Sequence, residues 1–275
     1  MATSLSDALE IVVRTDPGVV RSHNEDAVFA NPHQGLAILA DGMGGYNAGE
    51  VASSMATTLL STELEAAFTT CAPHQMGSDG RCQGHRSVLE QIANANASIY
   101  HAAASQPQYA GMGTTLVVAL FYDNLVTVAH IGDSRLYRLR GEAFQQITRD
   151  HSLLQEQLDS GMISAEEARH SQNRNLVTRA LGVDPEVETE IHDYPVQPGD
   201  IYLLCSDGLN DMVEDEEIGT TLQMLSANLE LAATQLVQMA NDNGGRDNVS
   251  VILVKILHEF PAPKGRWAKL IAWFR

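Results

Sequence analysis

Residues 36–45 read Leu36-Ala-Ile-Leu-Ala-Asp-Gly-Met-Gly-Gly45, an apolar run that ends in an acidic residue and a group of glycines. The apolar run predicts a buried β-strand, because it is short and bounded by a turn signal. The glycines permit a tight turn and a close approach of the backbone to a ligand. Apolar residues at helical spacing follow from Ala48 to Phe68. The pattern thus places the Asp41 carboxylate and the Gly42 carbonyl at a strand end, where both can bind a cation.

Acidic residues stand at the ends of further apolar runs in the same way. They are Asp26 before residues 27–29, Asp133 after residues 126–131, Asp207 after residues 201–204 and Asp247 before residues 249–254. A single Asp beside a strand is usually a turn former, because its side chain caps local backbone. Strands of one sheet or sandwich, however, bring their ends to a common rim. Five such positions therefore predict one shared acidic site.

An acidic site of this kind calls for cations, because gathered carboxylates repel one another and are costly to desolvate. Sets of oxygen ligands favour Mg²⁺, Mn²⁺ or Ca²⁺ over zinc. Two ions roughly 4 Å apart would acidify a bridging water and direct it at an electrophile. Phosphorus is the natural target, since the ions neutralise its oxygens and the leaving alkoxide. The residues alone therefore predict a divalent-metal hydrolase of phosphoesters.

A phosphate site also requires a guanidinium group, and two arginines are candidates. Arg14 and Arg21 flank the turn that leads into Asn24-Glu-Asp26. Arg14 is equally well explained as a surface residue paired with Asp16 or Glu25. Arg21 lies nearer to the acidic signature and is the preferred candidate for binding the substrate phosphate.

The composition indicates a single large domain in a reducing compartment. The 275 residues are 44% hydrophobic, enough to bury a sizeable core. A formal net charge of −18 argues against nucleic acid as a partner, because phosphate contacts need Lys and Arg. Three cysteines do not form a disulfide framework. With neither a signal peptide nor an apolar run of the roughly 18 residues that span a membrane, the sequence predicts a cytoplasmic protein.

The order of apolar patterns predicts an α+β fold with antiparallel sheets in the middle and helices outside. Strands are expected at residues 11–13, 36–40, 115–122, 125–131, 136–139, 201–205 and 249–257. Helices are expected at residues 48–68, 87–104 and 229–241.

Three segments stand apart from this pattern. Residues 150–182 have a weak helical pattern and are interpreted as a helical flap beside the site. Residues 69–86 are polar and turn-rich and predict a surface loop. This loop repeats a C-x-x-H spacing that is either a zinc site or an unrelated set of free side chains, at Cys71, His74, Cys82 and His85. Residues 264–275 form a basic, aromatic tail, which suits an acidic membrane surface or an apolar groove on a partner, or packs on its own domain.

Seven motifs in order resemble those of metal-dependent protein phosphatases of the type 2C (PPM) family, bacterial branch. The resemblance covers about residues 10–257. The motifs are Arg14-Thr-Asp-Pro-Gly-Val-Val-Arg21, Asn24-Glu-Asp26, Asp41-Gly-Met-Gly-Gly45, Gly111-Met-Gly-Thr-Thr115, Gly132-Asp-Ser-Arg135, Ser206-Asp-Gly208 and Gly245-Arg-Asp-Asn248.

The resemblance implies a phosphatase domain at residues 1–260, built as a four-layer α-β-β-α sandwich with two central antiparallel sheets. It implies hydrolysis of phosphoserine and phosphothreonine in proteins with Mn²⁺ or Mg²⁺, two ions per chain and a weaker third. The positions that match the ligands of the two ions are Asp26, Asp41, Gly42 through its carbonyl, Asp207 and Asp247. Asp133, with Asp207, matches the third site, and Arg21 matches the phosphate-binding arginine. A cognate Ser/Thr kinase system and a monomeric state are further expectations.

Two departures limit what the resemblance implies. Met43 stands where eukaryotic members often carry a His that is a candidate general acid, so water is the expected proton source. The tail at residues 261–275 is not part of the shared domain.

Two other readings compete with the phosphatase. One is a weakly active phosphoprotein-binding scaffold of the same fold, and the other is a structural Ca²⁺ site, which leaves Arg21 and the glycine turns unexplained.

Overall fold

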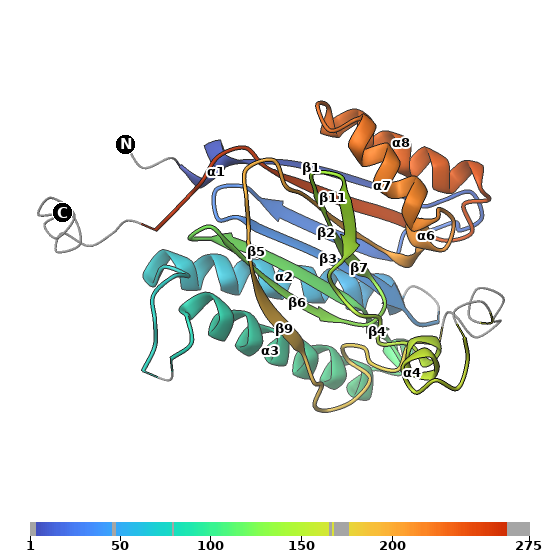
Figure 1. The fold of residues 1–275 in the computed structure, drawn as a ribbon. Helices are drawn as coiled ribbons and strands as arrows, with labels where there is room; N and C mark the ends of the chain where they lie inside the picture. Colours follow the sequence, from blue (N-terminus) through green and yellow to red (C-terminus); the bar gives the residue numbers. More distant parts are fainter. Residues whose placement is uncertain (1–3, 46–47, 79, 165–166, 168–175, 263–275) are drawn as a thin grey trace, which may run out of the picture.

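Two antiparallel β-sheets form the centre of the molecule (Figure 1). The computed structural model describes residues 4–45, 48–78, 80–164, 167 and 176–262. The first sheet has the order β1 (Leu9–Asp16), β11 (Val249–Ile256), β10 (Ile201–Cys205), β7 (Arg135–Arg140), β8 (Ala143–Gln146). The second has the order β2 (Asp26–Asn31), β3 (Leu36–Met43), β5 (Leu116–Tyr122), β6 (Leu125–Ile131), β9 (Glu190–Pro195), and β4 (Gly113–Thr114) also pairs with β3.

The two faces of each sheet are buried against different layers. Alternate residues of a strand point to opposite faces, and in β3 Leu39 packs between the sheets while Ile38 packs under helices. Between the sheets, the rings of Phe121 from β5 and Tyr202 from β10 meet edge to face at 5.3 Å. Burial on both faces explains why these strands read as continuous apolar runs rather than alternating ones.

Helices cover the outer face of each sheet (Figure 1). On the second sheet lie α2 (Ala48–Thr70) and α3 (Gln83–Ser105). On the first lie α7 (Asp215–Met224) and α8 (Leu229–Asp242). Short helices are α1 (Leu5–Ala8), α4 (Leu153–Asp159), α6 (Asp207–Asn210) and the 3₁₀ turn η1 (Pro107–Tyr109). The predicted four-layer α-β-β-α sandwich is therefore confirmed.

All seven predicted strands and all three predicted helices are present. The structure also contains elements that the sequence pattern did not predict. β8 is a short edge strand, β9 is rich in polar residues, and α7 begins with three acidic residues. None of them carries a strong apolar period. The predicted loop is also too long: α2 continues to Thr70 and α3 begins at Gln83, so the connection is residues 71–82.

Two of the segments set apart in the sequence are only partly described. Within the predicted flap, α4 forms a helix, whereas residues 165–166 and 168–175 lie outside the described residues. The tail from residue 263 onward also lies outside them. No described helix combines the length and the apolar character needed to cross a membrane.

Candidate active site

Asp26 and Asp41 lie directly opposite each other at one end of the second sheet. Asp26 begins β2, and the antiparallel register pairs it with Asp41 in β3. The two segments of the first sheet that carry the other aspartates lie close by: Ser206, the residue before Asp207, donates its hydroxyl to Asp26 Oδ2 at 2.8 Å. The two sheets are thus connected by a hydrogen bond at the acidic site.

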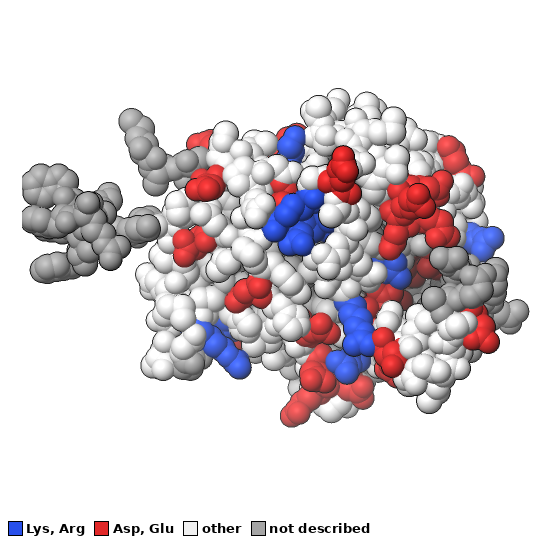
Figure 2. Space-filling view, in the orientation of Figure 1, with Lys and Arg blue, Asp and Glu red and all other residues white. Residues whose placement is uncertain are grey.

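The five predicted aspartates act on one another electrostatically. Burial raises the pKa of Asp41 well above its ordinary value, and the charges of Asp26, Asp207, Asp133 and Asp247 add to the rise. Burial and the nearby Asp133 likewise raise the pKa of Asp207. The structure therefore brings all five together, as the sequence predicted. Figure 2 shows acidic side chains gathered on the side of the molecule where α6 and α7 lie.

The chemistry of this cluster fits bound divalent cations. Asp26 Oδ1 is buried without a hydrogen-bond partner, and burial raises the pKa of Asp26 to about 6. An orphaned buried carboxylate oxygen costs free energy unless a cation or donor reaches it. The ligand atoms are all oxygens, which suits Mg²⁺ or Mn²⁺.

Glycines allow the backbone around the site to pack closely. A Cβ at Gly42 would lie 2.2 Å from the carbonyl oxygen of Gly49 in α2, and one at Gly208 would lie 1.9 Å from the carbonyl oxygen of Asn248. Both distances are far inside van der Waals contact, so only glycine fits. The close approach at Gly42 sets the end of β3 against the start of α2, whereas the sequence pattern predicted a close approach to a ligand.

Asn248 holds the loop that carries Arg21. Its amide nitrogen donates to the carbonyls of Pro17 at 3.0 Å and His23 at 2.8 Å, and its Oδ1 accepts from the Glu25 backbone N–H at 2.8 Å. The Asn248 side chain is thereby fully used in fixing residues 17–25. Asn248 belongs to one of the sequence motifs, but the sequence did not predict its role. Its hydrogen-bond partners are more than 220 residues away along the chain.

Arg21 reaches the acidic cluster and Arg14 does not. The Arg21 guanidinium donates to Asp247 Oδ2 at 2.7 Å and is half exposed. Its pKa is raised by this hydrogen bond and by the Asp247 charge. The Arg14 guanidinium instead pairs with Glu230 of α8. The alternative pairing of Arg14 with Asp16 or Glu25 is therefore wrong, because the β1 side chain extends toward α8.

Three of the four side chains of the C-x-x-H repeat have other contacts. The Cys71 sulfur donates to Gln75 Oε1 at 2.9 Å, the Cys82 sulfur lies 2.9 Å from Tyr122 Oη, and His85 faces Asp193 at 3.6 Å. These contacts favour the reading of unrelated free side chains over a zinc site.

Two sheets between helices, with buried aspartates gathered at one end, define an α-β-β-α protein of the metal-dependent hydrolase class. A family model, "Protein phosphatase 2C", matches residues 19–253. The serine/threonine phosphatase stp of Listeria monocytogenes is 40% identical over 245 residues, covering 88% of this chain and 94% of the relative. The protein phosphatase PhpP of Streptococcus pneumoniae is 36% identical over 256 residues, covering 91% and 99%.

Solved structures agree with the sequence relatives. The crystal structure of the Mycobacterium tuberculosis serine/threonine phosphatase PstP/Ppp has a TM-score of 0.81 at 37% identity, covering 91% of this chain and 99% of that one. The PstP catalytic domain in complex with two manganese ions has a TM-score of 0.78 at the same identity and coverage. The chain belongs to the protein phosphatase 2C family. The resemblance of its motifs to that family is confirmed.

The raised pKa values predict a pH-dependent stability of the metal-free protein. A carboxyl group whose pKa is near 6 when folded, as for Asp26 and Asp133, and about 3.9 when unfolded is harder to ionise in the folded state. Its stabilising contribution is complete at low pH and is lost as the pH rises through about 6. Thermal unfolding in a chelating buffer should therefore show Tm falling from about pH 4 to pH 7, and Mn²⁺ should restore it.

Asp26→Asn removes one of these charges and should raise the free energy of unfolding of the metal-free protein at pH 8 by about 1–3 kcal/mol. Asp242→Asn, at an exposed position in α8, is the matched control and should change it little. A flat Tm profile in the native protein, or equal effects of the two variants, would contradict the electrostatic account.

Proposed function

We propose that this phosphatase hydrolyses phosphoserine and phosphothreonine in proteins, with Mn²⁺ or Mg²⁺ as cofactor. The observation that carries the proposal is the convergence of buried, partly unsatisfied carboxylates beside a half-exposed arginine. The relatives named serine/threonine phosphatases support the substrate class. When bound, two divalent ions would supply a nucleophilic water at neutral pH and neutralise phosphoryl oxygens.

The residues proposed to hold the two ions are Asp26, Asp41, Asp207, Asp247 and the carbonyl of Gly42. Asp133, with Asp207, is proposed to hold a weaker third ion. Support comes from the electrostatic contact among the carboxylates and from the buried oxygen of Asp26 that no protein group satisfies. The PstP catalytic domain, which was solved with two manganese ions, supports the number of ions.

Arg21 is proposed to bind the substrate phosphate. Its planar guanidinium can donate two parallel hydrogen bonds to phosphoryl oxygens. Its side chain is half exposed, so a phosphorylated segment of another protein can reach it. Its loop is fixed by Asn248, which reduces the conformational freedom lost when the phosphate binds.

The leaving alkoxide also needs a proton. Met43 ends β3 next to the site, and a thioether has no proton to donate. Water is therefore proposed as the proton source.

The segment 150–182 is proposed as a flap that influences which phosphoproteins bind.

The proposed setting is the cytoplasm, where the protein would act as a monomer and oppose a cognate Ser/Thr kinase. The scaffold alternative predicts phosphoprotein binding without turnover. The presence of every predicted metal ligand at one end of the sheets favours an active enzyme over that alternative.

The first test measures phosphate release from a phosphothreonine peptide with and without Mn²⁺. Asp207→Asn should reduce Mn²⁺-dependent kcat/KM roughly 100-fold or more, because it removes a proposed ligand of the ions. Asp242→Asn is the control. If the native chain releases no phosphate with any divalent metal yet binds the peptide, the scaffold reading replaces the proposal.

A pair of arginine variants tests the phosphate-binding role. Hydrogen bonds to charged groups are worth about 1.5–3 kcal/mol, so Arg21→Ala should lower kcat/KM roughly 10- to 100-fold, mainly through KM. Arg14→Ala removes only an exposed ion pair with Glu230 and should leave kcat/KM unchanged. Equal effects of the two substitutions would refute a specific role for Arg21.

Residues 264–275 are proposed to contact an anionic membrane surface. The only two tryptophans of the chain, Trp267 and Trp273, lie in this tail, so tryptophan fluorescence reports on it alone. Vesicles that contain anionic lipid should shift the emission to shorter wavelength, and neutral vesicles should not. Replacing Lys264, Arg266 and Lys269 by Glu should abolish the shift. An unchanged spectrum with anionic vesicles would contradict the membrane proposal and leave a protein partner or packing on its own domain.

A further inference from the structure

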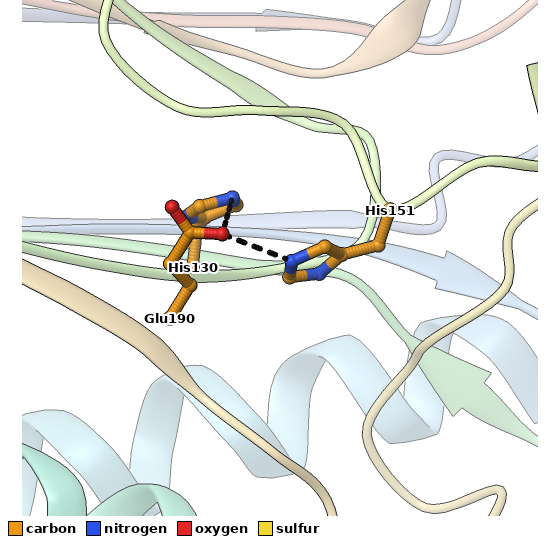
Figure 3. Close-up of side chains that lie close together, drawn as sticks. All are labelled: His130, His151 and Glu190. Carbon is orange, nitrogen blue, oxygen red and sulfur yellow. Dashed lines mark ion pairs between the residues drawn. The ribbon is translucent and has the colours of Figure 1, made fainter. Parts of the chain in front are cut away.

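Two buried histidines and a glutamate meet beside the acidic site. His130 in β6 and Glu190 in β9 are cross-strand neighbours. The ring of His151, in the segment after β8, stacks on that of His130 at 4.8 Å with an interplanar angle of 13°. Figure 3 shows one carboxylate oxygen of Glu190 facing a nitrogen of each ring. One ligand atom from each of the three lies within 4.8 Å of the others.

The hydrogen bonds determine where the ring proton of His151 is. His130 Nε2 lies 2.8 Å from the carbonyl oxygen of Arg149 and 3.3 Å from the backbone nitrogen of the same residue, so its role as donor or acceptor depends on the tautomer. His151 Nδ1 accepts from the backbone N–H of Gly132 at 3.2 Å, so the proton of the neutral ring is on Nε2. That Nε2 is buried, makes no hydrogen bond and lies 3.5 Å from Glu190 Oε2, so it interacts with the Glu190 carboxylate electrostatically.

Burial lowers the pKa of both histidines and keeps their rings neutral. For Glu190, partial burial opposes ionisation, but the two histidines outweigh it and lower its pKa. The result is a carboxylate beside two stacked, neutral rings, at 4.0 Å from His130 Nε2 and 3.5 Å from His151 Nε2. The nitrogen of His151 that faces Glu190 carries the ring proton, so its lone pair is not available to a metal ion in this tautomer.

His151 holds Gly132 through both polar groups of its backbone. The His151 backbone N–H donates to the Gly132 carbonyl at 2.9 Å, while its Nδ1 accepts from the Gly132 N–H. Gly132 has a φ of +100°, and a Cβ there would lie 2.7 Å from the Thr115 side chain. The peptide that precedes Asp133 therefore has a conformation that only glycine adopts easily, fixed by one histidine.

The same turn is tied to the aspartates. Ser134 Oγ lies 2.7 Å from Thr115 Oγ1, which accepts from the backbone N–H of Asp41 at 3.1 Å. On its other side, the His151 carbonyl accepts from the backbone N–H of Thr178 at 2.8 Å, at the end of the proposed flap. His151 thus lies between the Asp133 turn and the segment that returns from the flap.

We propose that Glu190 and His151 are positioning residues that hold the Gly132–Asp133 turn so that the Asp133 carboxylate can bind the third metal ion. The inference rests on the proposed function, in which Asp133 is a ligand of that ion. The Glu190 carboxylate, 3.5 Å from His151 Nε2, favours the tautomer with the proton on that nitrogen, which leaves Nδ1 free to accept from Gly132. A carboxylate that fixes a histidine tautomer in this way is a general device around metal sites, although here the histidine holds backbone rather than metal.

The test is equilibrium binding of Mn²⁺ to the full chain, measured by the electron paramagnetic resonance of free Mn²⁺. The native protein should show two tight sites and one weaker site. His151→Leu loses the hydrogen bond to Gly132 and the contact with Glu190. It should raise the Kd of the weaker site roughly tenfold or more and leave the tight sites unchanged. His151→Asn places an amide oxygen where Nδ1 was and should retain most of the affinity. The Kd of the weaker site in Glu190→Leu should lie between the values for His151→Asn and His151→Leu.

His192→Leu is the matched control, because exposed His192 lies 3.3 Å from the other Glu190 oxygen and does not contact Gly132. If His151→Leu binds the third ion as tightly as native protein does, the positioning role is overturned. Thermal unfolding shows whether each variant folds. If His151→Leu does not fold, the Kd of the weaker site in Glu190→Leu is compared with that in His192→Leu, and equal values overturn the positioning role.

Asp133→Asn separates the two levels of the proposal. If Asp133→Asn abolishes the third site and His151→Leu does not, only the positioning inference fails. If native protein binds no third ion, or Asp133→Asn retains it, the proposed role of Asp133 fails and the inference with it. A titration with Zn²⁺ alone gives one more outcome: stoichiometric zinc binding that His151→Asn abolishes would make the cluster a metal site and overturn the positioning role.

Discussion

The burial of several carboxylates at one end of two packed sheets is the constraint on which the rest of the structure depends. A fold of this size gains stability from apolar burial between and outside its sheets, and buried charge works against that gain. Asp41 and Asp207 are partly buried among other acidic groups, whose charges add to the rise in their pKa values, and Asp26 Oδ1 has no hydrogen-bond donor. The folded state is therefore incomplete without cations, which links the stability of the domain to its cofactor.

The scaffold meets this constraint with polar side chains that connect the two sheets at the site. Ser206 of the first sheet bonds Asp26 of the second, and Asn248 bonds the backbone of Glu25. On the second sheet, Thr115 links Asp41 to Ser134. Each of these side chains fixes the backbone or a carboxylate oxygen at or beside an aspartate, so the proposed ligands would be held before any ion binds. Such preorganisation avoids the reorganisation that a flexible acidic loop would need.

The layers and the aspartates could be predicted from the sequence because both have local signals. Continuous apolar runs identified β6, β10 and β11, and Asp133, Asp207 and Asp247 stand beside the ends of these runs. β9 and α7 lacked an apolar period and were missed. The roles of Asn248 and His151 could not be predicted either, since each depends on contacts with distant backbone that exist only in the folded chain. A residue that binds a ligand is recognisable by its type, whereas a residue that positions backbone is recognisable only by geometry.

The gradient of exposure across the site explains how a phosphoprotein can reach groups that must be shielded from water. Asp133 is buried, Asp41 and Asp207 are partly buried, the Asp247 side chain is 36% exposed and that of Arg21 is 51% exposed. Charges in the buried part act through a low dielectric, where they hold ions strongly. Arg21 at the surface stays accessible to a bulky substrate, and its ion pair with Asp247 holds the guanidinium beside the aspartates. In the proposed role of Arg21, a bound phosphate would therefore lie next to the proposed ion ligands, while the folded part of its protein stays outside.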